Sequence, residues 1–343
     1  MNALLALRRL YPSVAEHRSV EREVHRLLKD NLQEHYLRPV PAPPGTLRYA
    51  SKNIFSILFL ALYRGAGVQE KRRLLYGVLN HCVRGIVTAA DNILDDEYKE
   101  MLPLRLSGTG NRFPSIMHIL LFDRILFDIL EEASVDGTIP VGAVRRVKKG
   151  IMDALVPIGD EEGSEEGGIS EILHPDEILA SVHMYKGGNL LRLAFVAPLL
   201  LEDEARAPLA EADAGIYRIG LALQVIDDLT DFHADLRDRR HNYLLSWVHH
   251  RGRRQERSAL ERILAGDDDS DITLSFPEAV RHVAGSAVGE ALEGFRLLEK
   301  AGLPLSRRHA EHLIRALFRI RGVGELLPFV PRHPDTVLLR EAA

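Results

Sequence analysis

Two groups of aspartates lie within otherwise uncharged stretches of the 343-residue chain, at Asp91–Asp95 and at Asp227–Asp231. The first follows Gly-Ile-Val-Thr-Ala-Ala, and the second follows Gly-Leu-Ala-Leu-Gln-Val-Ile. Each group contains two aspartates four residues apart, so in a helix both carboxylates project from one face. Like charges on one face repel each other, and partial burial increases that cost. The spacing therefore predicts that each face binds a cation.

The chemistry that fits two such faces is the binding of a diphosphate through Mg²⁺. Mg²⁺ takes hard oxygen ligands and is commonly held by a few carboxylates together with substrate phosphates. A neutralised diphosphate is a better leaving group, and apolar helix walls would house a hydrocarbon tail and a carbocation. One such pair alone usually marks a solvent-facing helix end. Two pairs, each preceded by at least six uncharged residues, favour a metal site.

A lysine with two glycines directly after it lies between the aspartate groups, in His183-Met-Tyr-Lys186-Gly187-Gly188-Asn. Gly costs about 1 kcal/mol relative to Ala in a helix interior, so this pair predicts a bend or a close approach. A bend would direct Lys186 inward as a point charge for phosphate. The alternative is a surface lysine at an ordinary helix junction.

Three arginines, Arg237, Arg239 and Arg240, follow the second aspartate group. They are positioned either to close over a diphosphate or to pair with Asp235 and Asp238 on a solvated face.

Helical spacing of apolar residues extends along nearly the whole chain, so we expect an all-α fold of about ten or more helices. We find no repeat and no long linker, and we therefore expect one domain over 1–343. Within it, 1–44 holds a helix and a Pro-rich connection, and 327–343 is a tail. The expected helices cover 16–36, 53–63, 69–100, 115–133, 141–156, 175–200, 204–233, 276–301 and 306–326.

Several other features are interpreted as ordinary. The acidic stretches 159–168 and 266–271 lack the ligand spacing of a calcium loop, and we interpret both as solvated loops. The basic run Arg251–Arg254 has the same interpretation, and a net charge of −5 gives no general attraction for nucleic acid.

The longest uncharged run, 53–63, is far shorter than the ~20 residues of a membrane-spanning helix. No signal-peptide pattern is visible, and the single cysteine, Cys82, excludes an intramolecular disulfide. We therefore expect a cytoplasmic protein without a transmembrane segment.

These motifs resemble those of the trans-isoprenyl diphosphate synthase family, within the class I isoprenoid synthase superfamily. Gln224-Val-Ile-Asp-Asp-Leu-Thr-Asp231 matches the second family motif, Gln-x-x-Asp-Asp-x-x-Asp, in full. Asp91–Asp95 matches the first, Asp-Asp-x-x-Asp, with Asn92 at its second position. Lys186 occupies the place of a family lysine on a bent helix between the motifs.

The resemblance implies a helical bundle around a central cavity, a homodimer and three Mg²⁺ ions when diphosphate is bound. The implied metal ligands are Asp91, Asp95, Asp227 and Asp231. The implied catalytic residues are Asp91, Asp95, Asp227, Asp228 and Lys186, with Asp228 and Gln224 also supporting the ligands and Lys186 binding the allylic diphosphate. The family reaction is ionisation of an allylic prenyl diphosphate, attack by the double bond of isopentenyl diphosphate, and loss of a proton.

The chain departs from the family pattern in the basic residues. The arginine pair that follows the first motif is replaced by Glu100 and Met101. The segment Gly-Lys-x-x-Arg-Pro that holds isopentenyl diphosphate is reduced to Gly45-Thr-Leu-Arg48-Tyr-Ala-Ser-Lys52, in which Arg48 and Lys52 are the remaining basic residues. The candidate substrate-binding residues are therefore Lys186, Gln224, Arg48, Lys52, Arg105, Arg112 and Arg240. The remaining pattern favours ionisation of an allylic diphosphate, and it leaves open whether isopentenyl diphosphate is the second substrate.

Three functions remain in competition. The first is an isoprenyl diphosphate synthase that elongates a chain head to tail. The second is a terpene cyclase or a head-to-head prenyl synthase that uses the same ionisation, which the reduced isopentenyl diphosphate segment favours. The third is a non-catalytic subunit that binds prenyl diphosphate, against which the four intact candidate ligands argue.

Overall fold

The computed structural model describes residues 10–40, 44–96, 98–108, 110–266, 271–303, 310–311 and 314–315. Across these ranges the regular elements are helices, and the single β pairing is an isolated bridge between Leu37 and Leu104. The predicted all-α fold is confirmed. Most of the helix expected at 306–326, the tail at 327–343 and the centre of the acidic stretch 266–271 fall outside the described residues.

The chain divides into two compact units. Unit 1 comprises Met1–Ala154, Leu193–Asp213 and Leu298–Pro304, and unit 2 comprises Leu155–Arg192, Ala214–Leu297 and Leu305–Ala343. The organisation of 1–343 as one domain stays a prediction.

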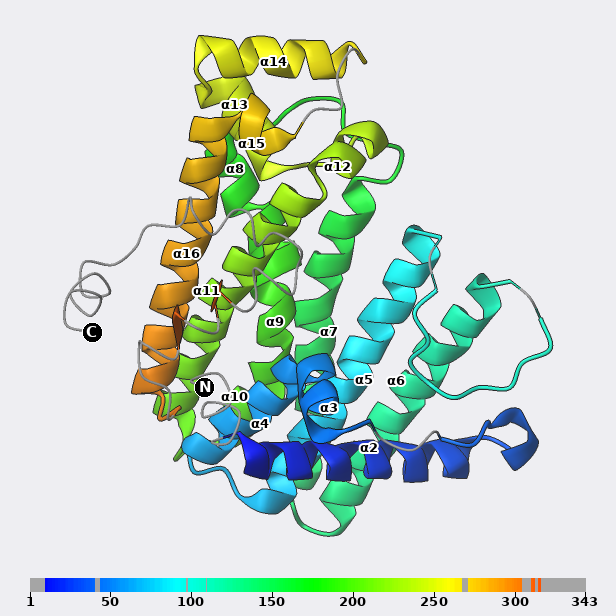
Figure 1. The fold of residues 1–343 in the computed structure, drawn as a ribbon. Helices are drawn as coiled ribbons and strands as arrows, with labels where there is room; N and C mark the ends of the chain where they lie inside the picture. Colours follow the sequence, from blue (N-terminus) through cyan, green and yellow to red (C-terminus); the bar gives the residue numbers. More distant parts are fainter. Residues whose placement is uncertain are drawn as a thin grey trace. The chain divides into compact units, whose positions relative to one another are not determined.

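Unit 1 is built on the helix pair α5 and α6, with α2 lying across both (Figure 1). Gly85 on α5 allows the two helices to approach closely, because a Cβ at this position would lie 2.1 Å from the ring of Phe122 on α6. The helices of this unit are α2 (Tyr11–Asn31), η1 (Glu34–Tyr36), α3 (Thr46–Lys52), α4 (Ile54–Gly65), α5 (Glu70–Leu94), α6 (Arg112–Val135), η3 (Leu193–Phe195) and α10 (Val196–Leu201). Two more helices, α7 (Val141–Ser164) and α11 (Arg206–Thr230), begin in unit 1 and end in unit 2.

Unit 2 packs its helices around an apolar core to which α11 and α16 both contribute. A glycine also allows α11 and α16 to approach closely, because a Cβ at Gly294 of α16 would lie 2.8 Å from the carbonyl oxygen of Gly215 on α11. Helix α16 (Pro277–Lys300) begins in unit 2, and its last three residues belong to unit 1. The other helices of this unit are α8 (Pro175–Ala180), η2 (Met184–Asn189), α9 (Leu190–Arg192), α12 (Phe232–Asp238), α13 (Tyr243–Arg251), α14 (Arg254–Leu264) and α15 (Ile272–Ser275).

Three sequence-based expectations about helix boundaries are wrong. The segment 159–168 is not a loop throughout, because α7 continues to Ser164. The segment 175–200 is not one helix but a series of short helices that includes the π-helical turn η2. Helix α5 ends at Leu94 rather than at residue 100, and Asp95 is its C-cap residue.

None of the helices that the structure describes combines the length and the apolar composition that crossing a bilayer requires.

Candidate functional site

The second aspartate group lies where α11 passes into α12 in unit 2. The backbone N–H of Asp231 donates to the carbonyl oxygen of Asp227 over 2.8 Å, so the helical spacing of the two residues is preserved at the junction. Asp227 is half-buried and Asp231 is exposed, whereas Asp228 between them is buried. Two carboxylates therefore occupy an accessible face, and the third points into the protein.

The buried carboxylate of Asp228 is held by three protein groups. Its Oδ2 accepts a hydrogen bond from the backbone N–H of Tyr243 over 2.6 Å and lies 2.8 Å from Nε2 of the buried His183. Its Oδ1 accepts from Nε2 of Gln224 over 3.2 Å. These contacts place Asp228 where it orients Gln224 and the start of α13, while its catalytic role stays a prediction.

A further carboxylate, Asp235, continues the four-residue spacing from Asp231. Burial, followed by the nearby charges of Asp228 and Asp231, raises its pKa to about 7, although Nδ2 of Asn242 donates to it over 2.8 Å. From the sequence, Asp235 is expected only to pair with arginine. Its position eight residues after Asp227 is the sequence feature that places it on the same helical face.

The donor atoms of this face fit Mg²⁺. Carboxylate oxygens of Asp227 and Asp231 are hard ligands on an accessible helix face, and Mg²⁺ usually completes its octahedral shell with water and substrate phosphate. Within the described residues, no group of three or more His, Cys, Asp or Glu side chains is arranged to hold a metal ion alone.

Lys186 lies in the π-helical turn η2, which is packed closely against α11. A Cβ at Gly187 would lie 2.6 Å from the carbonyl oxygen of Gly220 and 2.9 Å from Cβ of Gln224, and one at Gly188 would meet the ring of Tyr217. Of the predicted bend or close approach at the paired glycines, the close approach is confirmed. Gln224 is one helical turn before Asp227, so η2 brings Lys186 to the part of α11 that carries the aspartates.

The ammonium of Lys186 forms ion pairs with two carboxylates from the end of α7 and the residues just after it. Its Nζ lies 3.0 Å from Oε2 of Glu165 and 3.3 Å from Oε2 of Glu162. Burial disfavours the charged form of Lys186, but the two carboxylates together outweigh burial and raise its pKa. The acidic stretch that was interpreted as a solvated loop therefore supplies the partners of this lysine.

The three arginines after the aspartate group have different surroundings. Arg237 forms an exposed ion pair with Asp238, with Nε 3.6 Å from Oδ1, as on a solvated face. Arg239 adopts a left-handed backbone with φ of 56°, and its Nη2 donates to the carbonyl oxygen of Ile169 over 2.8 Å. Arg240 lies close enough to Asp235 to oppose the rise of its pKa.

The first aspartate group lies at the C-terminal end of α5 in unit 1. The N–H of Asp95 donates to the carbonyl oxygen of Asp91 over 2.8 Å, and Asp91 is half-buried while Asp95 is exposed. Asn92 is buried, and its side chain forms two hydrogen bonds with the backbone of Lys99. Its Nδ2 donates to the carbonyl oxygen of Lys99 over 3.1 Å, and its Oδ1 accepts from the N–H of Lys99 over 2.9 Å. The asparagine at the second motif position therefore fastens the loop that follows α5.

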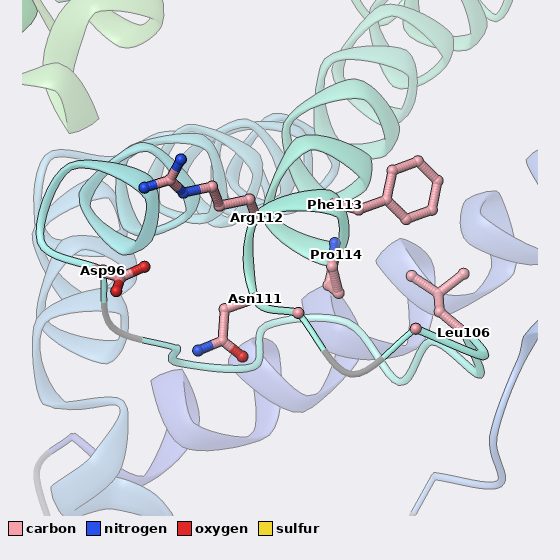
Figure 2. A pocket seen from close by; sticks show the side chains of 8 residues that line it. Asp96, Leu106, Asn111, Arg112, Phe113 and Pro114 are labelled. Atoms are coloured by element: carbon pink, nitrogen blue, oxygen red, sulfur yellow. The ribbon is translucent and has the colours of Figure 1, made fainter.

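The basic residues predicted to bind substrate in unit 1 are exposed. Arg48 and Lys52 both lie on α3, and Arg105 lies on the segment between α5 and α6. Arg112, the first residue of α6, lines a pocket of about 350 Å³. In Figure 2 the side chains of Arg112 and Phe113 point to opposite sides of the start of α6, with Arg112 on the side of Asp96. The other lining residues are Leu106, Gly108, Gly110, Asn111 and Pro114.

An arginine of unit 1 that the sequence motifs did not indicate forms no ion pair within the part of the chain that the structure describes. Arg84 on α5 places Nη1 3.4 Å from Oγ of Ser56, and its Nε is buried without a hydrogen-bond partner. Burial lowers its pKa, which the nearby carboxylate of Glu21 opposes. The sequence signal was a lone charge directly before the uncharged run that leads to Asp91.

Two histidines beside Arg84 are held in the neutral form. Burial, followed by the charge of Arg84, lowers the pKa of His17 to about 4 and that of His81 to about 3. His17 Nδ1 lies 2.7 Å from the hydroxyl of Tyr49, which donates to Glu21 over 2.6 Å. The neutral histidines add no positive charge beside Arg84, and the carboxylate of Glu21 is the nearby negative charge.

No family model and no curated protein sequence matches the chain. Solved structures with the same fold include a decaprenyl diphosphate synthase from Rhodobacter capsulatus, with a TM-score of 0.59 and 16% identity over 91% of this chain and 98% of that chain. A geranylgeranyl pyrophosphate synthetase from Geoglobus acetivorans has a TM-score of 0.59 and 16% identity over 92% and 98%. An octaprenyl pyrophosphate synthase from Helicobacter pylori has a TM-score of 0.57 and 14% identity over 88% and 98%. The chain therefore has the fold of the prenyl diphosphate synthases, which confirms the fold that the resemblance implied.

Proposed function

We propose that the protein is a Mg²⁺-dependent prenyltransferase, an isoprenyl diphosphate synthase that ionises an allylic prenyl diphosphate and condenses it with isopentenyl diphosphate. The observation that carries this proposal is the accessible pair formed by Asp227 near the end of α11 and Asp231 just after that helix, with Lys186 on a turn that contacts α11. Carboxylates for metal ions and an ammonium for phosphate are the groups that diphosphate departure requires. The fold shared with prenyl diphosphate synthases supports the same function.

The residues have distinct roles in this proposal. Asp227 and Asp231 would hold Mg²⁺, as would Asp91 and Asp95, and the bound metal would neutralise charge that develops on the leaving diphosphate. Lys186, on the turn that packs against α11, would add a positive charge for the phosphate. Asp228 receives three hydrogen bonds and keeps Gln224 in place.

The second substrate is supported by Arg84. A guanidinium with a buried, unbonded Nε and no ion pair among the described residues favours an anionic ligand in unit 1. The exposed Arg48 and Lys52 add positive charge on α3 of the same unit. This second anion site favours chain elongation over a cyclase, which needs only one diphosphate.

The test is to incubate the purified protein and Mg²⁺ with dimethylallyl, geranyl, farnesyl and geranylgeranyl diphosphates, with and without isopentenyl diphosphate. Longer prenyl diphosphates that form only with isopentenyl diphosphate are the expected result. Hydrocarbons or alcohols formed without it would overturn elongation in favour of a cyclase or a head-to-head synthase. Binding without turnover of any substrate would show a non-catalytic subunit. Size-exclusion chromatography with light scattering tests the homodimer that the resemblance implies.

A further inference from the structure

Lys186 is surrounded by more negative charge than it carries. Its side chain is 12% exposed, and those of its partners Glu165 and Glu162 are 6% and 31% exposed. One ammonium and two carboxylates leave the cluster with a net negative charge, and it lies beside the helix that carries Asp227. A lysine that simply attracts phosphate would not need two carboxylates within ion-pair distance.

Hydrogen bonds hold the C-terminal end of the segment that carries these glutamates. After α7 the chain turns through Gly167 and Gly168, both with left-handed φ, at 87° and 85°. A Cβ at Gly168 would lie 2.9 Å from Cβ of Arg239, so glycine is required for the close approach. The N–H of Ile169 donates to the carbonyl oxygen of Arg239 over 2.8 Å, and the guanidinium of Arg239 donates back to the oxygen of Ile169. These bonds fix the turn that follows Glu165.

The two glutamates differ in how firmly they are placed. Glu165 is buried, and its Oε1 has no hydrogen-bond partner, so this carboxylate is desolvated without being fully bonded. Glu162 is more exposed and farther from Nζ of Lys186, and water can replace the ammonium as its partner. An incoming phosphate oxygen can therefore take the place of Glu162, while Glu165 continues to orient the lysine.

We propose that Glu162 and Glu165 are positioning residues that make Lys186 accept a diphosphate only when the diphosphate carries bound Mg²⁺. This inference rests on the proposed function. A metal-free diphosphate brings several negative charges to a buried cluster that is already negative, and in a low-dielectric site this repulsion is strong. Bound Mg²⁺ cancels most of that charge, so the same cluster then no longer repels the head group. The ion pairs thereby prevent unproductive occupation by free diphosphate.

The experiment measures the dissociation constant of inorganic diphosphate by calorimetry, with excess Mg²⁺ and with a chelator. The wild type is compared with Glu162→Gln, Glu165→Gln and the double variant, and Glu166→Gln is the control. Glu166 is exposed and adjacent, so its substitution removes the same charge without touching Lys186. We expect the double variant to bind metal-free diphosphate at least tenfold more tightly than the wild type, and Glu166→Gln to leave binding unchanged. Circular dichroism checks that each variant is folded, and the more exposed Glu162→Gln gives the same direction of change if the double variant is unfolded.

The outcomes separate this inference from the function on which it rests. If the wild type binds diphosphate with Mg²⁺ but the glutamine variants gain nothing without it, the positioning role is wrong and the proposed function stands. If the wild type fails to bind diphosphate even with Mg²⁺, the proposed function itself is wrong. Weaker binding by folded variants under both conditions would show that the glutamates only support the local fold, which also overturns the inference.

Discussion

Asp227 and Asp228 are neighbours in sequence and have opposite surroundings. Asp227 faces outward on α11, and Asp228 is buried against Tyr243, His183 and Gln224. Removing the carboxylate of Asp227 deletes a proposed metal ligand. Removing the carboxylate of Asp228 leaves buried hydrogen-bond donors without an acceptor.

These surroundings predict different effects on stability. Asp228→Ala should lower the free energy of unfolding by about 1–3 kcal/mol, because it leaves buried hydrogen-bond donors without their acceptor. Asp227→Ala should change it by no more than about 0.5 kcal/mol, as is usual for accessible positions. Denaturant titration followed by circular dichroism measures both values, and equal losses would contradict the separation of roles.

The contact between η2 and α11 depends on glycine at the points of closest approach. A Cβ at Gly220 would lie 2.3 Å from the carbonyl oxygen of Gly187, a distance at which one backbone must move. This contact holds the turn that carries Lys186 against the helix that carries Asp227. A change in the contact would therefore move Lys186 relative to Asp227.

Gly220→Ala should therefore destabilise the protein by about 1–3 kcal/mol and weaken diphosphate binding, because overpacking displaces the backbone. Gly159→Ala is the matched control, since a Cβ there meets nothing within 4 Å and alanine favours the helix by about 0.5–1 kcal/mol. Thermal unfolding of the two variants gives the comparison. A Gly220→Ala protein as stable as the wild type would show that this approach is not required.

Local patterns predicted some elements well and others poorly, for identifiable reasons. The uncharged runs before Asp91 and Asp227 predicted long helices, and α5 and α11 are both present. The glycines after Lys186 predicted the close approach to α11. The burial of Glu165 could not be predicted, because it depends on Lys186, which lies far along the chain and reaches it only through tertiary contact. Composition alone makes 159–168 resemble a solvated loop.

Arg84 shows the same limit in unit 1. In sequence it is one charge on a helix, and its isolation follows from the packing of α2 and α4 around it. Ser56 of α4 and His17 of α2 are its neighbours there. The anion site that we propose at Arg84 therefore depends on tertiary packing that the local sequence does not specify.

For the molecule as a whole, the neutral histidines make stability depend on pH. The folded-state pKa values of His17 and His81 are lowered from 6.5 to about 4 and about 3. Between those values and 6.5 the unfolded chain binds more protons than the folded protein, so stability is lost as the pH falls through this window.

Each such histidine contributes a slope of up to about 1.4 kcal/mol per pH unit below pH 6.5. His81→Gln removes one of them, so its free energy of unfolding should fall about 1 kcal/mol less per pH unit than that of the wild type between about pH 6 and 4.5. Denaturant titrations at several pH values give both slopes. Parallel curves would mean that His81 is not held neutral.

The most direct measurement of the central claim is the release of inorganic diphosphate by the purified protein from farnesyl diphosphate and its shorter and longer homologues, each with isopentenyl diphosphate present. With Mg²⁺ we predict release that stops with a chelator and falls at least about 100-fold in Asp227→Ala, since a group that stabilises the leaving charge is lost. Asp238→Ala, which removes an exposed carboxylate paired with Arg237, should leave the rate unchanged. Release that persists in Asp227→Ala or without Mg²⁺, or no release from any of these substrates, would contradict the claim.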